Sequence, residues 1–128
     1  MNTLPIQIGH DILEIARIRK TYARYGNRFL HRILTNQEIT YCLAHADPVP
    51  RIAARFSAKE SIAKALGTGI HDALNWKDIE IQHTPQGAPF VILTPSARER
   101  FCDPKIALSI SHCHTFVSTT ALWMKESP

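Results

Sequence analysis

Long apolar stretches and paired cysteines are both missing from this 128-residue chain. No apolar run approaches the roughly 20 residues that a membrane-spanning helix needs, so we expect no membrane association. The N-terminus lacks the basic and then apolar segments of a secretory signal peptide, which favours a cytoplasmic location. The three cysteines, Cys42, Cys102 and Cys113, lie far apart and form no CxxC pair. This pattern predicts reduced thiols rather than a disulfide framework.

Acidic side chains are absent between residues 15 and 37. The same region is rich in positive charge, and the whole chain has a formal net charge of +4. An anionic partner is therefore indicated. The basic residues of the region are Arg17, Arg19, Lys20, Arg24, Arg28 and Arg32, together with His31.

Internal repeats, low-complexity segments and interdomain linkers are absent as well, so the length of the chain predicts one domain over residues 1–128. Hydrophobic periodicity predicts a compact α+β fold in which N-terminal helices pack on an antiparallel sheet. The expected helices cover residues 12–24, 28–34, 35–46, 51–66 and 95–101, and the expected strands cover residues 6–12, 76–82, 89–94, 105–112 and 116–123.

Local signals set several of these bounds. Gly9 is expected to bend the first strand. Thr35 and Glu38 have the spacing of a capping box, which opens a helix. The prolines within residues 47–50 predict a loop, and Gly67 ends the helix that follows it.

The helix expected over residues 51–66 places Glu60 one turn before Lys64. A carboxylate beside an ammonium suits an enzyme that handles a phosphate ester with Mg²⁺, although such pairs are more often surface ion pairs. Asp11 is the second candidate carboxylate, because Mg²⁺ is commonly held by one or two carboxylates with water and phosphate oxygens. The position of Asp11 by itself favours a helix N-cap.

Two other motifs have competing interpretations. Backbone amides around Gly67 and Gly69 suit the approach of a phosphate, but the dipole at a helix C-terminus disfavours anions, so a helix stop is simpler. His112 and His114 have the spacing of a zinc-binding pair on a strand. No further ligands with zinc-site spacing accompany them, so donation to a phosphate or a strand-end role is preferred.

The basic region has an internal order. One stripe is basic and the adjacent stripe is apolar, whereas a solvated helix usually mixes charges of both signs. A basic stripe beside aromatic residues suits docking of an acidic surface, which is nucleic acid, lipid or an acidic helix. The basic stripe contains Arg17, Lys20, Arg24 and Arg28, and the apolar stripe contains Ile18, Tyr22, Tyr25 and Phe29.

Taken in order, these motifs are similar to those of the holo-acyl-carrier-protein synthases, the small class of 4′-phosphopantetheinyl transferases. The most specific is Arg55-Phe-Ser-Ala-Lys-Glu-Ser-Ile-Ala-Lys-Ala-Leu-Gly-Thr-Gly-Ile70. The others lie within residues 8–18, 28–38, 76–80, 87–89 and 109–112.

This resemblance implies the 4′-phosphopantetheinyl transferase fold and a Mg²⁺-dependent activity in fatty acid biosynthesis. The implied reaction moves the 4′-phosphopantetheine group from coenzyme A to a serine of an acidic apo-acyl carrier protein and releases adenosine 3′,5′-bisphosphate. A homotrimer with active sites shared between neighbouring subunits is implied too. Nucleic acid is not an expected partner.

The resemblance also implies roles for single residues. Asp11 and Glu60 correspond to the Mg²⁺ ligands, and Glu60 and Lys64 to catalytic residues. Coenzyme A is expected to contact Lys64, Gly67, Gly87, Pro89 and His112, and the carrier protein is expected to dock on Arg17, Arg24, Arg28 and Phe29.

Some positions depart from the family pattern. His10 precedes Asp11 where a small or apolar residue is usual, so an effect on the pH dependence of the metal site is expected. Ser57 replaces a common alanine. Two other functional classes fit less well: a nucleic-acid-binding module leaves Asp11 and Glu60 without a task, and a magnesium phosphohydrolase needs a further acidic cluster that the sequence lacks.

Overall fold

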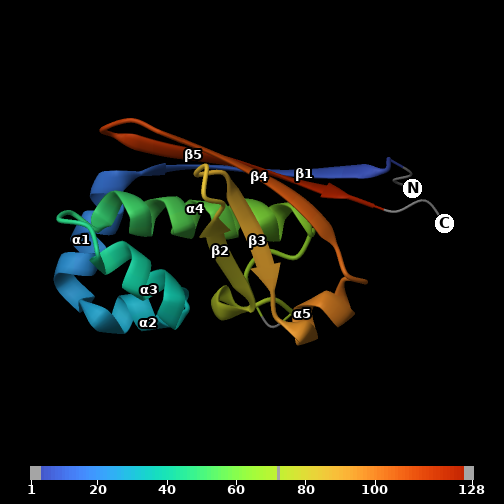
Figure 1. Cartoon of the computed structure of the whole chain (residues 1–128), viewed down its shortest axis with the longest axis horizontal. Helices are drawn as coiled ribbons and strands as arrows, with labels where there is room; N and C mark the ends of the chain where they lie inside the picture. The colour runs from blue at the N-terminus through green and yellow to red at the C-terminus, as the bar shows by residue number, and fades with distance from the viewer. Residues whose placement is uncertain (1–3, 72, 126–128) are drawn as a thin grey trace.

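The computed structural model of the chain describes residues 4–71 and 73–125. It confirms the α+β fold, with the helices on one side of an antiparallel sheet (Figure 1). The helices are α1 (Ile15–Tyr25), α2 (Asn27–Ile33), α3 (Asn36–Leu43), α4 (Val49–Ala65) and α5 (Pro95–Arg100), with a 3-10 helix η1 (Trp76–Asp78). The strands are β1 (Ile6–Glu14), β2 (Ile79–His83), β3 (Pro89–Leu93), β4 (Lys105–His112) and β5 (Phe116–Met124).

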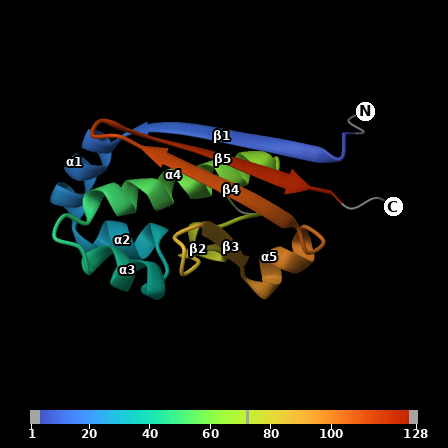
Figure 2. The same cartoon turned by 45° about the horizontal axis from the view of Figure 1, so that its top comes forward.

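The main sheet has the order β1-β5-β4, so the first strand of the chain pairs with the last. Helix α4 runs along one face of this sheet and packs against β1 and β5, and the other face carries no further element of the described chain (Figures 1 and 2). One buried cluster joins α4 to α1, α2 and α3, and a second joins it to the β2–β3 hairpin and α5. Helix α4 is therefore the scaffold of the whole domain.

The first strand is longer than predicted, and the first helix begins later. The ladder between β1 and β5 continues to the pair Glu14–Phe116, so α1 begins at Ile15 and not at residue 12. Asp11 consequently lies within a strand, opposite Thr119. The N-cap interpretation of Asp11 is wrong.

Gly9 does not interrupt β1, because it pairs with Ala121 within the continuous ladder. It is needed for another reason, the close approach of α4. A Cβ atom at Gly9 would lie 1.8 Å from the carbonyl oxygen of Ser61 and 2.5 Å from the backbone nitrogen of Ala65. The glycine thus sets how closely β1 and α4 pack.

The capping box before α3 is confirmed. The backbone N–H of Glu38 donates to Thr35 Oγ1 at 3.3 Å, and the backbone N–H of Thr35 donates to Glu38 Oε1 at 2.9 Å. The helix ends at Leu43, earlier than predicted, where the N–H of His45 bonds to the carbonyl of Cys42 in a tighter turn.

Two further bounds differ from the prediction. Helix α4 begins at Val49, since Pro50 lies in its first turn, where a missing N–H costs nothing. The strand expected from residue 76 begins at residue 79. Asn75 and Asp78 form a capping box there, and it turns the intervening residues into η1.

The stop after α4 is a Schellman motif, as the glycine pattern predicts. Gly67 has a φ of 81°, its N–H bonds to the Lys64 carbonyl at 3.0 Å, and the N–H of Thr68 bonds to the Ala63 carbonyl at 3.2 Å. The two expected hairpins are present as β2–β3 and β4–β5.

The cysteines Cys42, Cys102 and Cys113 are free thiols, as predicted. Burial raises the pKa of Cys42 to about 11, so this thiol stays protonated. Among residues 4–71 and 73–125, no helix combines the length and the apolar character needed to cross a membrane.

Candidate active site

Asp11 and Glu60, from β1 and α4, line the same pocket of about 490 Å³, which we call the carboxylate pocket. Asp11 points towards α4 because alternate residues of β1 face the helix, and this face includes Gly9 and Leu13. Arg17, from the first turns of α1, lines the pocket as well. The predicted convergence of the two carboxylates is therefore present in the structure.

The two carboxylates influence each other electrostatically. Burial raises the pKa of Glu60, and the negative charge of Asp11 raises it further, while Lys64 lowers it. The ammonium of Lys64 lies 3.2 Å from Asp11 Oδ1 and 2.9 Å from the carbonyl oxygen of His10. Among the described ion pairs Lys64 is thus paired with Asp11, and the surface ion pair between Glu60 and Lys64, the competing interpretation of this motif, is not formed.

This donor set fits a divalent cation such as Mg²⁺. The part of the chain that the structure describes contains no group of three or more His, Cys, Asp or Glu side chains arranged for a metal. A magnesium site nevertheless often has only one or two protein carboxylates as ligands, and its other ligands are water and substrate oxygens. The two mutually repelling carboxylates in this open pocket meet that requirement. The side chain of Lys64 is half-exposed, so its ammonium is accessible to a phosphate.

The imidazole of His10 lies on the outer face of the sheet, away from the carboxylate of Asp11. Its Nδ1 is 3.0 Å from Thr120 Oγ1, and its Nε2 is 3.5 Å from Ser118 Oγ. The expected effect of His10 on the metal site must therefore act across the sheet. Ser57 is buried and lies 2.9 Å, Oγ to Oγ1, from Thr119, so it joins α4 to β5.

A second pocket of about 470 Å³ adjoins the first, because Thr21, Phe29 and Phe56 line both. The ring of Phe56 lies 6.3 Å from that of Phe29 and 4.8 Å from that of Trp76, centroid to centroid. We call this second pocket the aromatic groove; it is lined by Thr21, Tyr25, Arg28, Phe29, Arg32, Ile33, Phe56 and Trp76.

Phe56 and Trp76 were not among the site residues that the sequence predicts. The sequence could have indicated Phe56 as a site residue, because Phe56 lies one turn before Glu60 on the same face of α4. Nothing in the sequence indicates Trp76 as a site residue, because it belongs to η1 and only the tertiary fold brings it against Phe56.

Residues of the basic and apolar stripes line both pockets. Arg17 lines the carboxylate pocket and Arg28 lines the aromatic groove, whereas Arg24 lies over the ring of Tyr25 at 5.2 Å. Tyr25 is 48% exposed and, like Phe29, lines the aromatic groove. A turn at Gly26, with a φ of 57°, separates α1 from α2.

The remaining predicted residues lie elsewhere. Gly87 lies in the β2–β3 turn, Pro89 is the first residue of β3, and His112 is the last residue of β4. None of these three lines the carboxylate pocket or the aromatic groove within one chain. Gly67 lies just beyond Lys64 at the end of α4.

Comparison with known proteins identifies relatives over nearly the whole chain. Residues 7–116 match the family model of the 4′-phosphopantetheinyl transferase superfamily. A holo-[acyl-carrier-protein] synthase of Protochlamydia amoebophila is 42% identical over 94% of this chain and 98% of its own length. One from Chlamydia pneumoniae is 48% identical over 91% of this chain and 95% of its own length.

Solved structures of such enzymes also cover nearly the whole chain. The holo-[acyl-carrier-protein] synthase of Neisseria meningitidis has a TM-score of 0.87 at 33% identity and covers 93% of this chain and 98% of its own. The Helicobacter pylori enzyme, solved in complex with coenzyme A, has a TM-score of 0.83 at 36% identity and covers 91% and 98%.

Proposed function

Because the chain belongs to the 4′-phosphopantetheinyl transferase superfamily, we propose that it is a Mg²⁺-dependent holo-acyl-carrier-protein synthase. It transfers 4′-phosphopantetheine from coenzyme A to a serine of apo-acyl carrier protein in the cytoplasm and so supports fatty acid biosynthesis. The observation that carries this proposal is the pocket in which Asp11 and Glu60 meet beside the half-exposed ammonium of Lys64.

In the proposed reaction, the seryl hydroxyl gives its proton to a base, to which no residue is assigned, and its oxygen forms a bond to the phosphorus next to pantetheine. The bond from this phosphorus to adenosine 3′,5′-bisphosphate breaks, and the bisphosphate leaves. Mg²⁺, held by Asp11 and Glu60, would offset the charge that develops on the leaving phosphate. Lys64 exchanges its contact with Asp11 for a phosphate oxygen of coenzyme A. Its charge then binds and orients the pyrophosphate next to the carboxylates.

We assign docking of the acidic carrier protein to Arg17, Arg24, Arg28 and Phe29. Arg17 and Phe29 line the carboxylate pocket, so a carrier protein bound there would bring its serine close to Asp11 and Glu60. The positive charge of the arginines favours an acidic partner and raises the rate of encounter.

The proposed assembly is a homotrimer with shared active sites. The face of the main sheet that α4 does not cover exposes large apolar side chains, which is typical of a surface that another subunit covers. In such an assembly Gly87, Pro89 and His112 would contact coenzyme A at the pocket of a neighbouring subunit. The exposed apolar residues on the face are Ile6, Ile8, Ile12, Phe116 and Met124.

One experiment tests the proposed function directly. The purified protein is incubated with coenzyme A, Mg²⁺ and an apo-acyl carrier protein, and the carrier is then weighed by mass spectrometry. We expect a mass increase of one phosphopantetheine group, which disappears when the metal is chelated or the acceptor serine is replaced by alanine. An unchanged carrier mass in the complete mixture would contradict the proposal.

A further inference from the structure

Lys59 lies next to Glu60 on α4, but its side chain has no exposed surface. Its ammonium donates to three oxygens: the carbonyl of Ile33 at 2.7 Å, Oε1 of Glu38 at 2.7 Å and the carbonyl of Trp76 at 3.0 Å. An ammonium has three N–H donors, so each donor of Lys59 is used. Lys59 has no role in the proposed transfer reaction.

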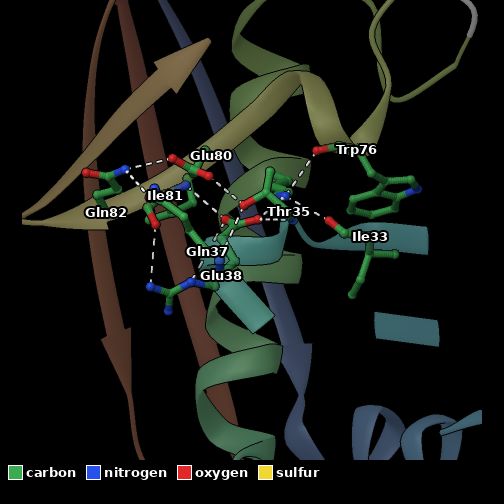
Figure 3. A network of polar contacts seen from close by, with 10 residues as sticks. Ile33, Thr35, Gln37, Glu38, Trp76, Glu80, Ile81 and Gln82 are labelled. Carbon is green, nitrogen blue, oxygen red and sulfur yellow. Dashed lines mark hydrogen bonds and ion pairs between the residues drawn. The ribbon is translucent and has the colours of Figure 1, made fainter. Parts of the chain in front are cut away.

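The partner carboxylate is equally enclosed, since Glu38 is 1% exposed. Its Oε1 also accepts from the N–H of Thr35 at 2.9 Å, and its Oε2 accepts from the N–H of Ile81 at 2.9 Å (Figure 3). The guanidinium of Arg55 is 3.9 Å from Oε2. The Lys59–Glu38 pair therefore joins the end of α2, the start of α3, α4, η1 and the first part of β2.

Two of the residues that this pair holds are walls of the aromatic groove. Ile33 and Trp76 both line the groove, and Lys59 binds both through their backbone carbonyls. The facing wall is Phe56, which lies on α4 one turn before Glu60 and contacts the ring of Trp76. The Lys59–Glu38 pair thus fixes the position of Trp76 relative to the carboxylates of Asp11 and Glu60.

Stability alone is a weak reason for such a pair. Apolar side chains of similar volume often replace a buried ion pair without loss of stability, because each charge loses its hydration on burial. A fully satisfied buried pair does, however, select one arrangement of the elements that it joins. For Lys59 and Glu38, that arrangement includes the groove beside Glu60.

We propose that Lys59 is a positioning residue: through its ion pair with Glu38 it holds Trp76 and Ile33 in place, and so shapes the groove that receives the carrier protein. Lys59 touches neither substrate. The inference rests on the proposed function, because Arg28 and Phe29, which that function assigns to carrier docking, line the groove. Its effect should therefore fall on the carrier protein and not on coenzyme A.

The test replaces the pair with the neutral combination Lys59→Met and Glu38→Gln. The buried guanidinium of Arg55, 3.9 Å from Glu38 Oε2, then keeps its charge without a carboxylate partner, so the fold of the variant is checked first. We expect kcat/KM for the carrier protein to fall by about tenfold to a hundredfold, as small displacements near a reacting group do. The KM for coenzyme A should stay within about twofold, since the carboxylates keep their places. Lys77→Met, at an exposed lysine beside Trp76, is the matched control and should behave as the unchanged protein.

A second measurement does not depend on activity. In a Trp123→Phe background, Trp76 is the only tryptophan, and its fluorescence reports its surroundings. The neutral pair should increase quenching of Trp76 by acrylamide, while circular dichroism shows that the protein is folded. If quenching and carrier kinetics were both unchanged and only the melting temperature fell, the pair would be merely structural and the inference overturned.

Trp76→Ala covers the case in which the paired variant does not fold. It removes the wall without touching the ion pair, and we expect the same selective loss of kcat/KM for the carrier protein. Unchanged carrier kinetics in Trp76→Ala would overturn the inference. Failure of the proposed function differs from failure of this inference. If the function were wrong, the protein without substitutions would transfer nothing, while acrylamide quenching would still report whether the Lys59–Glu38 pair positions Trp76.

Discussion

We propose that single residues at the junction of β1 and α4 carry the chemistry. Asp11 and Glu60 line one pocket, and the charge of Asp11 contributes to the raised pKa of Glu60. Repulsion between two partly buried carboxylates is relieved when a cation binds between them. The repulsion between Asp11 and Glu60 would therefore favour binding of the proposed Mg²⁺.

Replacement of Glu60 by glutamine should abolish transfer and leave the fold intact. The amide keeps the size of the side chain but loses the negative charge that a magnesium ligand needs. Even residues that only orient metal ligands cost roughly 10- to 100-fold when replaced, so we expect a loss above about a hundredfold. Transfer is measured by carrier mass, with Glu99→Gln on α5 as the matched control. Magnesium-dependent transfer by Glu60→Gln would show the metal assignment to be wrong.

At the scale of elements, the contact between β1 and α4 decides where the carboxylates meet. Gly9 lies on the same face of β1 as Asp11, and it allows the backbone of α4 to approach. Any side chain there must push the strand and the helix apart. Stability and the geometry of the site are therefore linked through one glycine.

Gly9→Ala should destabilise the domain by about 3 kcal/mol or more, at the upper end of what overpacking costs, because the added Cβ meets backbone that cannot rotate away. Urea unfolding followed by circular dichroism measures this. Gly26→Ala is the comparison, since its Cβ would meet nothing within 4 Å and only its φ of 57° is unfavourable. That variant should lose about 1–2 kcal/mol. Equal losses in the two variants would contradict the close-approach explanation.

At the scale of the whole molecule, charge is unevenly distributed. The basic residues of α1 and α2 lie at one end of the domain, and α5 lies at the other (Figure 1). Arg19 is neutralised by Asp47 at 2.8 Å, so the free positive field comes from other residues, including Arg17 and Arg28. Such a field would attract the proposed acidic carrier protein and make its binding depend on salt.

Arg17→Glu should raise the KM for the carrier protein roughly tenfold, because a charge reversal replaces an attraction by a repulsion, each worth about 0.2–1 kcal/mol when exposed. The KM for coenzyme A should change much less. For the unchanged protein, the KM for the carrier should rise with salt, since the screening length is about 10 Å at 0.1 M. Arg98→Glu on α5 carries the same charge change as a control. Equal effects of Arg17→Glu on both substrates would exclude the docking role.

The uncovered face of the main sheet should mediate the proposed homotrimer. Ile8 is 64% exposed in the first half of β1, and a glutamate there would place charge in the proposed subunit contact. We expect Ile8→Glu to convert trimers into monomers by size-exclusion chromatography with light scattering. Ile92→Glu, at an exposed apolar position of β3, should leave the trimer unchanged. A trimer that persists in Ile8→Glu would exclude this face as the contact.

Local patterns predicted most of the elements. The capping box of Thr35 and Glu38, the glycine stop at Gly67 and both hairpins depend on neighbouring residues, and all are present. The start of β2 was wrong for a local reason, the capping box of Asn75 and Asp78. The end of the first strand was wrong because a partner distant in sequence decides it. The ladder with β5 extends β1 through Asp11 to Glu14, and no local signal records it.

The sequence by itself determined which side chains are available: two carboxylates, a lysine one turn from one of them, and a run of basic residues without acids. Only the tertiary structure decided which of them meet. It paired Lys64 with Asp11, enclosed Lys59 against Glu38 and brought Trp76 to Phe56. The physical reason is that helix and strand periods fix the direction of a side chain along its own element, whereas its partner depends on how elements far apart in sequence pack.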